Sequence, residues 1–292
     1  MKTLIFTLIA GILAFYTPTI QAQDSITFPD DLEGWQTSWT VGINGSQASY
    51  SNWAQGGVNN IAATGSSNFS TVYKTGRFSY GFLLDTRFGK TRIQEEGTRK
   101  IDDRLLLKNR FLYDLGGEES DFKLFANIRF RTQFDKGFDY TSGEDGSNTL
   151  ISNFMAPAYF TQDAGLAYVP VSYFSVEAGL GLQQTFVRDR SLSETYGLAE
   201  GDRFRSEAGF TFGASFDATI AENLSFSSSI NTFTNMTKSV KSTDVYFSNK
   251  LTGRVNDFMN TSLNLDLVYD DNFSNKLQVA QILSLGISFT LR

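Results

Sequence analysis

The sequence contains no cysteine and no histidine among its 292 residues, and only four prolines. Without cysteine there is no disulfide framework, thiol nucleophile, iron–sulfur cluster or zinc ribbon. Without histidine, the Ser-His-Asp and Cys-His hydrolase mechanisms, His-ligated zinc or haem and an imidazole pH switch are excluded. Acidic residues outnumber basic ones, giving a net charge of −6, which argues against a general nucleic-acid-binding protein.

Long hydrophobic runs are also scarce, and the clearest one lies at the start of the chain. Lys2 precedes an apolar run over 4–16, and the small Ala22 stands before a polar, acidic stretch. This order is typical of a secretory signal peptide and predicts a targeting segment over 1–22, cleaved before Gln23. The alternative, a membrane anchor, is disfavoured because a spanning helix needs ~20 residues. We therefore expect an exported chain, either soluble or a membrane β-barrel.

Apolar side chains alternate with small or polar ones along the rest of the sequence. In 204–220 the Phe residues fall on even positions, whereas the charged residues and Gly fall on odd ones. A strand separates such sets onto two faces, while a helix would scatter them around its axis. Twelve segments follow this pattern and are predicted as strands: 37–50, 59–73, 77–90, 100–113, 122–134, 153–169, 173–188, 204–220, 224–236, 241–253, 259–269 and 277–292.

These segments are longer than an ordinary globular strand of ~5–6 residues and suit tilted strands that cross a bilayer. Their connections alternate as well. One set is short, at 74–76, 170–172, 221–223 and 254–257, with a longer member at 114–121. The other set tends to be longer, at 51–58, 91–99, 135–152 and 189–203, with shorter members at 237–240 and 270–276. Outer-membrane barrels show this asymmetry, and an even strand number places both termini on the periplasmic side.

The predicted fold is therefore an all-β, transmembrane, antiparallel up-and-down β-barrel of about twelve strands with a polar lumen. A soluble β-sandwich also alternates, but its strands are shorter and more often interrupted by proline. Pro157 is expected to kink one strand, because it removes a hydrogen bond from the sheet. The expected organisation is a signal peptide over 1–22, a short periplasmic segment over 23–36 and the barrel over 37–292. Aromatic residues near strand ends, such as Trp35 and Tyr73, are expected to form interfacial girdles.

Several short motifs carry a resemblance to a known family. They are Ser51-Asn52-Trp53-Ala54-Gln55-Gly56-Gly57 in the first loop, Tyr73-Lys74-Thr75-Gly76, Ile151-Ser152-Asn153-Phe154-Met155-Ala156-Pro157-Ala158-Tyr159, and Val268-Tyr269-Asp270-Asp271. Together they resemble a domain-of-unknown-function family of bacteroidete outer-membrane β-barrel proteins, from about Trp35 to the C-terminus. The resemblance implies a location and a fold, but no activity and no catalytic residues. Its most specific parts are the loop motif of Asn52, Trp53, Gly56 and Gly57 and the segment Ala156-Pro157-Ala158-Tyr159.

Charged residues on the polar, lumen-facing parity are unevenly placed. A basic stripe is expected from Arg104, Lys108, Arg110, Lys123, Arg129 and Arg131. An acidic wall is expected from Glu177, Glu207, Asp217, Asp244 and Asp266. This separation of charge is not complete, and the residues that depart from it are Lys250, Arg205, Arg87 and Asp85. In a ring of twelve strands the two groups face each other, so they either orient solutes in an open lumen or pair across a narrow one.

Catalysis and cofactor binding find little support in the sequence. The acidic loop residues, including Glu144, Asp145, Asp270 and Asp271, lack the spacing of a calcium loop, so we expect no metal site and no cofactor. Barrel phospholipases and proteases use a histidine base, and no carboxylate pair stands out for a glycosidase-type mechanism. The chain is therefore expected not to be an enzyme.

Two functions remain open from the sequence. The first is a porin-like, non-catalytic channel for small hydrophilic solutes that uses the basic stripe. The second is a structural or accessory subunit of an outer-membrane protein complex with a salt-bridge-plugged lumen. An apolar-ligand transporter is disfavoured by the polar lumen. The expected location is the outer membrane of a Gram-negative cell envelope, with membrane lipid and other outer-membrane proteins as partners and no nucleic acid.

Overall fold

A computed structural model describes residues 26–49, 58–117, 120–140, 148–270, 272 and 274–291. The predicted signal peptide over 1–22 and the motif residues Asn52, Trp53, Gly56 and Gly57 lie outside these residues. No helix among the described residues is long and apolar enough to cross a membrane.

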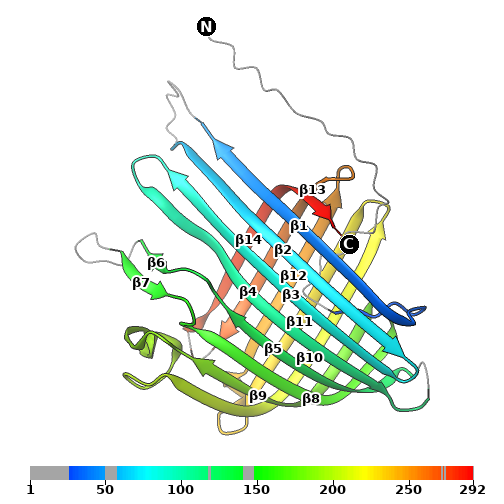
Figure 1. The fold of residues 1–292 in the computed structure, drawn as a ribbon. Helices are drawn as coiled ribbons and strands as arrows, with labels where there is room; N and C mark the ends of the chain where they lie inside the picture. The colour runs from blue at the N-terminus through cyan, green and yellow to red at the C-terminus, as the bar shows by residue number, and fades with distance from the viewer. Residues whose placement is uncertain are drawn as a thin grey trace.

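Twelve antiparallel strands form one closed barrel (Figure 1). Neighbours in sequence pair around the ring, and β14 pairs with β1 to close it. The strands are β1 (Gly34–Ala48), β2 (Asn60–Thr75), β3 (Phe78–Ile93), β4 (Gly97–Asp114), β5 (Phe122–Thr132), β8 (Ala158–Val171), β9 (Phe174–Phe186), β10 (Phe204–Ala221), β11 (Leu224–Asn235), β12 (Asp244–Arg254), β13 (Met259–Asp270) and β14 (Ser274–Thr290). The predicted fold class and strand number are confirmed.

The two ends of the barrel differ. The short-turn end carries the connections β2–β3, β4–β5, β8–β9, β10–β11 and β12–β13, together with the start of β1 and the end of β14. The loop end carries a small hairpin of β6 (Gly137–Asp139) and β7 (Thr149–Ser152) between β5 and β8. It also carries three short 3₁₀ helices, η1 (Arg190–Leu192), η2 (Glu194–Tyr196) and η3 (Val240–Ser242). In barrels of the outer-membrane type the short turns face the periplasm.

The outer wall of the barrel is apolar, as the alternation predicts. On β10, for example, Phe204, Phe210 and Phe212 are exposed, while Glu207, Gly209 and Asp217 on the opposite parity are buried. A contiguous apolar wall of this kind is unstable in water and is the surface that a barrel presents to lipid. The structure therefore corresponds to a transmembrane barrel whose polar parity faces a central lumen.

Aromatic residues form a belt around the outer wall near the short-turn end. Trp35 pairs with Tyr73, Tyr73 pairs with Tyr80, and Tyr80 pairs with Phe111 across four neighbouring strands. The Trp35 and Tyr73 rings lie 4.8 Å apart, and the Tyr80 and Phe111 rings lie 5.0 Å apart. Such amphipathic rings favour the headgroup level of a bilayer. The belt therefore marks one membrane interface.

Several predicted boundaries were wrong. The segment 91–99 is not a long loop, because β3 extends to Ile93 and β4 begins at Gly97. Gly97 closes this hairpin with a φ of 84°, a value that glycine adopts without steric cost. The segment 153–157 is not part of a strand, and Pro157 lies directly before β8 instead of kinking it. The Pro157 carbonyl accepts a hydrogen bond from the Thr132 hydroxyl at 3.0 Å.

Candidate functional site: the barrel lumen

The predicted basic stripe lies on the inward parity of β4 and β5. Lys108 is the register partner of Arg129, and Asp114 is the partner of Lys123. This parity is inward because Arg110 on β4 contacts Glu177 on β9, two strands that are not neighbours in the wall. The six residues predicted for the stripe share this face: Arg104, Lys108, Arg110, Lys123, Arg129 and Arg131.

Acidic side chains engage much of this stripe. Asp85 of β3 accepts a hydrogen bond from the Arg104 Nε at 2.8 Å, and Asp114 lies 2.6 Å from the Lys123 Nζ. Arg129 and Asp163 lie close enough for their opposite charges to attract each other. The stripe is therefore part of a mixed-charge network, and sequence reasoning missed Asp85 and Asp163 as its partners.

The predicted acidic residues also lie on the inward face, but not as one wall. Glu177 belongs to the pair with Arg110, while Glu207 lies 2.9 Å from the Arg205 Nε and accepts a hydrogen bond from the Asn235 amide at 2.8 Å. The Ser248 hydroxyl donates to Asp266. Asp217 and Asp244 are buried and have partners of their own. In the ring, β12 and β13 lie opposite β4 and β5, as predicted.

The lumen contains two main cavities that meet at Arg104. One cavity of about 450 Å³ extends toward the loop end and is lined by Arg129, Tyr159 and Tyr246 among others. The second, of about 340 Å³, lies between β1–β4 and β11–β14. Arg104, Ser229 and Ser248 line both, so the two cavities adjoin each other at these side chains. A smaller space of about 80 Å³ lies beside the Arg110–Glu177 pair.

The second cavity has a lining that sequence reasoning missed. Hydroxyl and amide side chains dominate it, and its basic residues Arg87, Arg104 and Lys250 are balanced by Asp85, Asp102 and Asp266. The sequence does contain this pattern, as serine, threonine and asparagine residues on the polar parity. The prediction took account only of the charged residues on that face. The uncharged lining residues include Thr40, Asn44, Thr64, Ser66, Asn68, Ser229, Ser248, Thr252, Ser262, Asn264, Ser284 and Ser288.

The N-terminal segment lies against the inner wall at the short-turn end. The side chains of Ile26 and Phe28 lie against Gly81, and a Cβ atom added at position 81 would collide with the Ile26 side chain. Phe28 packs against a buried apolar cluster of Leu112, Phe125 and Ala167. The Lys74 ammonium donates to the Asp30 carbonyl at 2.9 Å. This segment narrows one side of the lumen where the wall is apolar.

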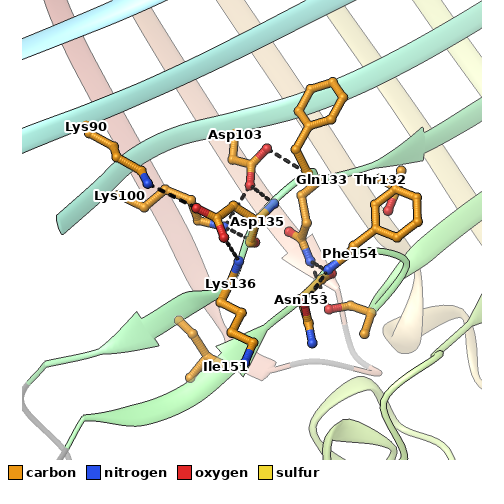
Figure 2. A network of polar contacts seen from close by, with 12 residues as sticks. Lys90, Lys100, Asp103, Thr132, Gln133, Asp135, Lys136, Ile151, Asn153 and Phe154 are labelled. Carbon is orange, nitrogen blue, oxygen red and sulfur yellow. Dashed lines mark hydrogen bonds and ion pairs between the residues drawn. The ribbon is translucent and has the colours of Figure 1, made fainter.

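At the loop end, a polar network holds the β5–β8 connection against the barrel rim (Figure 2). The Asp103 carboxylate accepts hydrogen bonds from the Phe134 N–H at 2.8 Å and the Asp135 N–H at 2.9 Å. The Lys100 ammonium lies 2.9 Å from the same carboxylate, and Lys90 lies 3.2 Å from Asp135. The Lys136 N–H, followed by Lys90, lowers the pKa of the Asp135 carboxyl below its ordinary 3.8.

A second contact set joins this connection to the β9–β10 connection. Ala156, Val187, Leu192 and Leu198 form a small buried core with Tyr196. The Tyr196 hydroxyl donates to the Ile151 carbonyl at 2.6 Å, and burial raises its pKa to about 12. The Ser191 hydroxyl and N–H lower the pKa of Asp189. These packed loops lie at the mouth of the larger cavity, which Tyr196 also lines.

Among the described residues, no group of three or more acidic side chains is arranged to hold a metal ion.

Comparison with known proteins connects the chain to a family without an assigned activity. Residues 46–138 match a family model described as "Protein of unknown function (DUF3078)". The match includes the Asn52-Trp53 motif and the Tyr73-Lys74-Thr75-Gly76 turn, whereas the motifs at 151–159 and 268–271 lie outside it. No curated protein matches the sequence.

Solved structures with similar backbones are outer-membrane barrels. The COG4313 outer membrane channel from Pseudomonas putida F1 is 13% identical with a TM-score of 0.41, covering 91% of this chain and 99% of that one. The translocator domain of autotransporter NalP from Neisseria meningitidis is 11% identical with a TM-score of 0.40, covering 89% of each chain. The KdgM porin in complex with disordered oligogalacturonate is 8% identical with a TM-score of 0.36, covering 87% and 99%.

Proposed function

We propose that this chain is an outer-membrane channel for small hydrophilic solutes, exported by a cleaved signal peptide and not catalytic. The proposal rests on two adjoining cavities in the lumen, of about 450 and 340 Å³, that share Arg104 in their linings. A lumen lined by polar groups replaces part of a solute's hydration, and charged rings in it set selectivity. The channel is narrow, because twelve strands fall between the filled barrels of ~8 strands and the open porins of ~16–18.

Mixed charge in the lumen favours dipolar or uncharged solutes over strongly charged ones. Arg104, Arg110 and Lys123 each contact a carboxylate, so the basic stripe presents little unbalanced positive charge. The local dipoles of these ion pairs orient a dipolar solute without holding it tightly. We therefore expect weak selectivity between anions and cations and stronger selectivity by size.

Liposome swelling tests this proposal. Vesicles that contain the purified barrel are expected to swell in arabinose or glycine faster than protein-free vesicles, and slowly in a tetrasaccharide. Swelling no faster than that of protein-free vesicles for every solute would contradict the channel.

The alternative, an accessory subunit of an outer-membrane complex, is favoured by one observation. The Arg110–Glu177 pair and the Phe28 cluster close one side of the lumen, as a structural barrel would require. Purification in mild detergent distinguishes the two functions. A stoichiometric partner, together with absent swelling, would favour the accessory subunit, and recovery of the barrel alone would count against it.

A further inference from the structure

Opposite charges line the larger cavity from opposite walls of the barrel. Arg129 and Arg131 are successive inward residues of β5, and both line the cavity of about 450 Å³. Asp270, at the loop end of β13, lines the same cavity. In the ring, five strands separate β5 from β13 on either side, so the two strands lie directly across the lumen from each other. A solute in this cavity therefore lies between two guanidinium groups and a carboxylate.

The position of Tyr159 shows that the lumen is narrow at this level. Tyr159 is the register partner of Arg131 on the neighbouring strand β8. Both Arg131 and Asp270 nevertheless lie close enough to the Tyr159 hydroxyl to interact with it electrostatically, although Asp270 belongs to the far wall. One small molecule in the cavity can therefore reach both charges.

Asp270 is oriented by uncharged donors. The Tyr246 hydroxyl donates to this carboxylate at 2.9 Å, and the Asn272 N–H donates at 3.0 Å. Two cations of the neighbouring strands and loops contact another acid: Arg205 and Lys238 lie 2.9 and 3.7 Å from Glu207. Uncharged donors hold the Asp270 carboxylate in place without neutralising it, so it can attract an ammonium group.

On the opposite wall, Arg131 is better placed than Arg129 to bind a carboxylate. Asp163 already attracts Arg129, and Arg131 lies one inward position nearer the loop end. A guanidinium group presents its N–H donors as a planar fork that matches the two oxygens of a carboxylate. The cavity therefore offers a site for each end of a molecule that carries both charges.

Apolar side chains supply much of the remaining lining. The Phe233 ring packs against Gly209 of the neighbouring strand, where an added Cβ atom would lie 2.6 Å from the ring. Glycine at this position lets the ring approach the wall closely and leaves room in the lumen. Apolar lining of this kind favours a ligand with apolar side chains. It includes Leu106, Tyr159, Tyr196, Phe233, Tyr246 and Val268.

We propose that the larger cavity binds zwitterionic dipeptides with apolar side chains. The carboxylate of the peptide binds Arg131, its ammonium group binds Asp270, and its side chains pack on the apolar lining. An extended dipeptide spans at most about 7 Å, which allows its two ends to reach toward opposite walls. The inference rests on the proposed channel, because the lumen must admit small solutes, and it deepens that proposal by naming a solute class.

The first experiment tests the ligand class by isothermal titration calorimetry of the full chain in detergent. Alanyl-phenylalanine is expected to bind once. Its N-acetylated form lacks the ammonium group and its C-terminal amide lacks the carboxylate, so each is expected to bind about tenfold more weakly. Pimelate, with a carboxylate at both ends, is expected to bind at least tenfold more weakly.

Two results would overturn the ligand class. If pimelate or the acetylated peptide binds as tightly as alanyl-phenylalanine, the ligand is not recognised as a zwitterion. If free phenylalanine binds as tightly as the dipeptide, the site does not recognise a peptide.

The second experiment assigns the two ends of the ligand. Arg131→Gln is expected to weaken alanyl-phenylalanine about tenfold and to leave binding of its amide unchanged, because the amide has no carboxylate to lose. Asp270→Asn is expected to weaken alanyl-phenylalanine about tenfold and to leave binding of the acetylated peptide unchanged. The matched controls are Arg92→Gln, at the exposed end of β3, and Asp257→Asn, in the exposed β12–β13 turn. Both lie outside the cavity lining and are expected to bind like wild type.

Heat-modifiable migration on gels confirms that each variant is folded. Unchanged binding of alanyl-phenylalanine by folded Arg131→Gln or Asp270→Asn would overturn the site. A variant that weakens the peptide and its blocked form equally would overturn the assignment of that end.

Calorimetry measures binding without conduction, so the site and the channel can fail separately. Vesicles that swell in arabinose, from a protein that does not bind the dipeptide, would overturn the site and leave the channel proposal intact. Dipeptide binding with the expected dependence on both ends, but without swelling, would support the site and contradict only the channel.

Discussion

Arg110 and Glu177 illustrate how a single contact shapes the lumen. They lie on β4 and β9, which two other strands separate in the wall, so their ion pair crosses the interior. Both side chains are largely buried, at 15% and 11% exposure. Removing one partner of a buried pair leaves the other charge uncompensated, while replacing both is much less costly.

Glu177→Gln is therefore expected to destabilise the barrel by about 3 kcal/mol, because Arg110 loses its counter-charge. Urea unfolding in lipid vesicles measures this change. The double variant Arg110→Met/Glu177→Leu is expected to regain most of the lost stability. A double variant as unstable as Glu177→Gln would show that the pair is not the cause.

Asp135 provides a residue-scale prediction about pH. Its folded pKa is depressed by the Lys136 N–H and then by Lys90, so its stabilising effect is complete above 3.8 and is lost as pH falls through the folded value. A carboxyl NMR titration is expected to give an apparent pKa below 3.8. Lys90→Met should raise that pKa toward its ordinary value, whereas the exposed Lys276→Met on β14 should not. A wild-type pKa at or above 3.8 would contradict the contacts at the loop end.

At the scale of elements, the strand prediction succeeded because alternation with period two is a local signal. All twelve wall strands carry it, and turn residues such as Gly76 and Asn223 separate several of them. The prediction failed where local pattern and tertiary contact disagree. Pro157 follows apolar residues that resemble a strand, yet Ala156 belongs to the small core of the packed loops. The charged stretch 91–99 resembles a loop, yet it continues two paired strands.

The candidate site was predictable only in part, for a related reason. Parity placed the basic stripe on the inward face, because side-chain direction follows from strand geometry. Parity does not show which inward residues meet, so the partners Asp85 and Asp163 were missed. The position of Phe28 was also unpredictable, because the contact of an irregular segment with a distant wall has no periodic signal.

The N-terminal segment provides an element-scale prediction. Phe28 packs on Leu112 and Phe125, so it forms an apolar constriction at the short-turn end. Hydrophobic constrictions restrict water and ions, and Phe28→Ser is expected to raise single-channel conductance by roughly a factor of two. Phe289→Ser, on the exposed outer wall of β14, is the control and should leave conductance unchanged. Unchanged conductance in Phe28→Ser would mean that this segment does not limit the path.

At the scale of the whole molecule, an apolar outer wall surrounds a polar interior, which is the arrangement that the proposed channel requires. Because lipid covers the outer wall, the inward charges act on what enters the lumen. The two cavities share Arg104 in their linings, together with Ser229 and Ser248. In the proposed channel, an ion that crosses both cavities passes the Arg104 guanidinium and its Asp85 partner.

The reversal potential of single channels in a planar bilayer under a KCl gradient tests the account most directly. Arg104→Gln removes the closer of the two guanidinium groups beside Asp85 and leaves only Arg87, 3.9 Å away, so we expect a shift toward cation selectivity. Arg92→Gln removes the same charge at the exposed end of β3, outside the lining of either cavity, and is predicted to leave the reversal potential unchanged. Equal reversal potentials for wild type and Arg104→Gln, or no channels from the folded wild-type protein, would contradict a conducting lumen that passes Arg104.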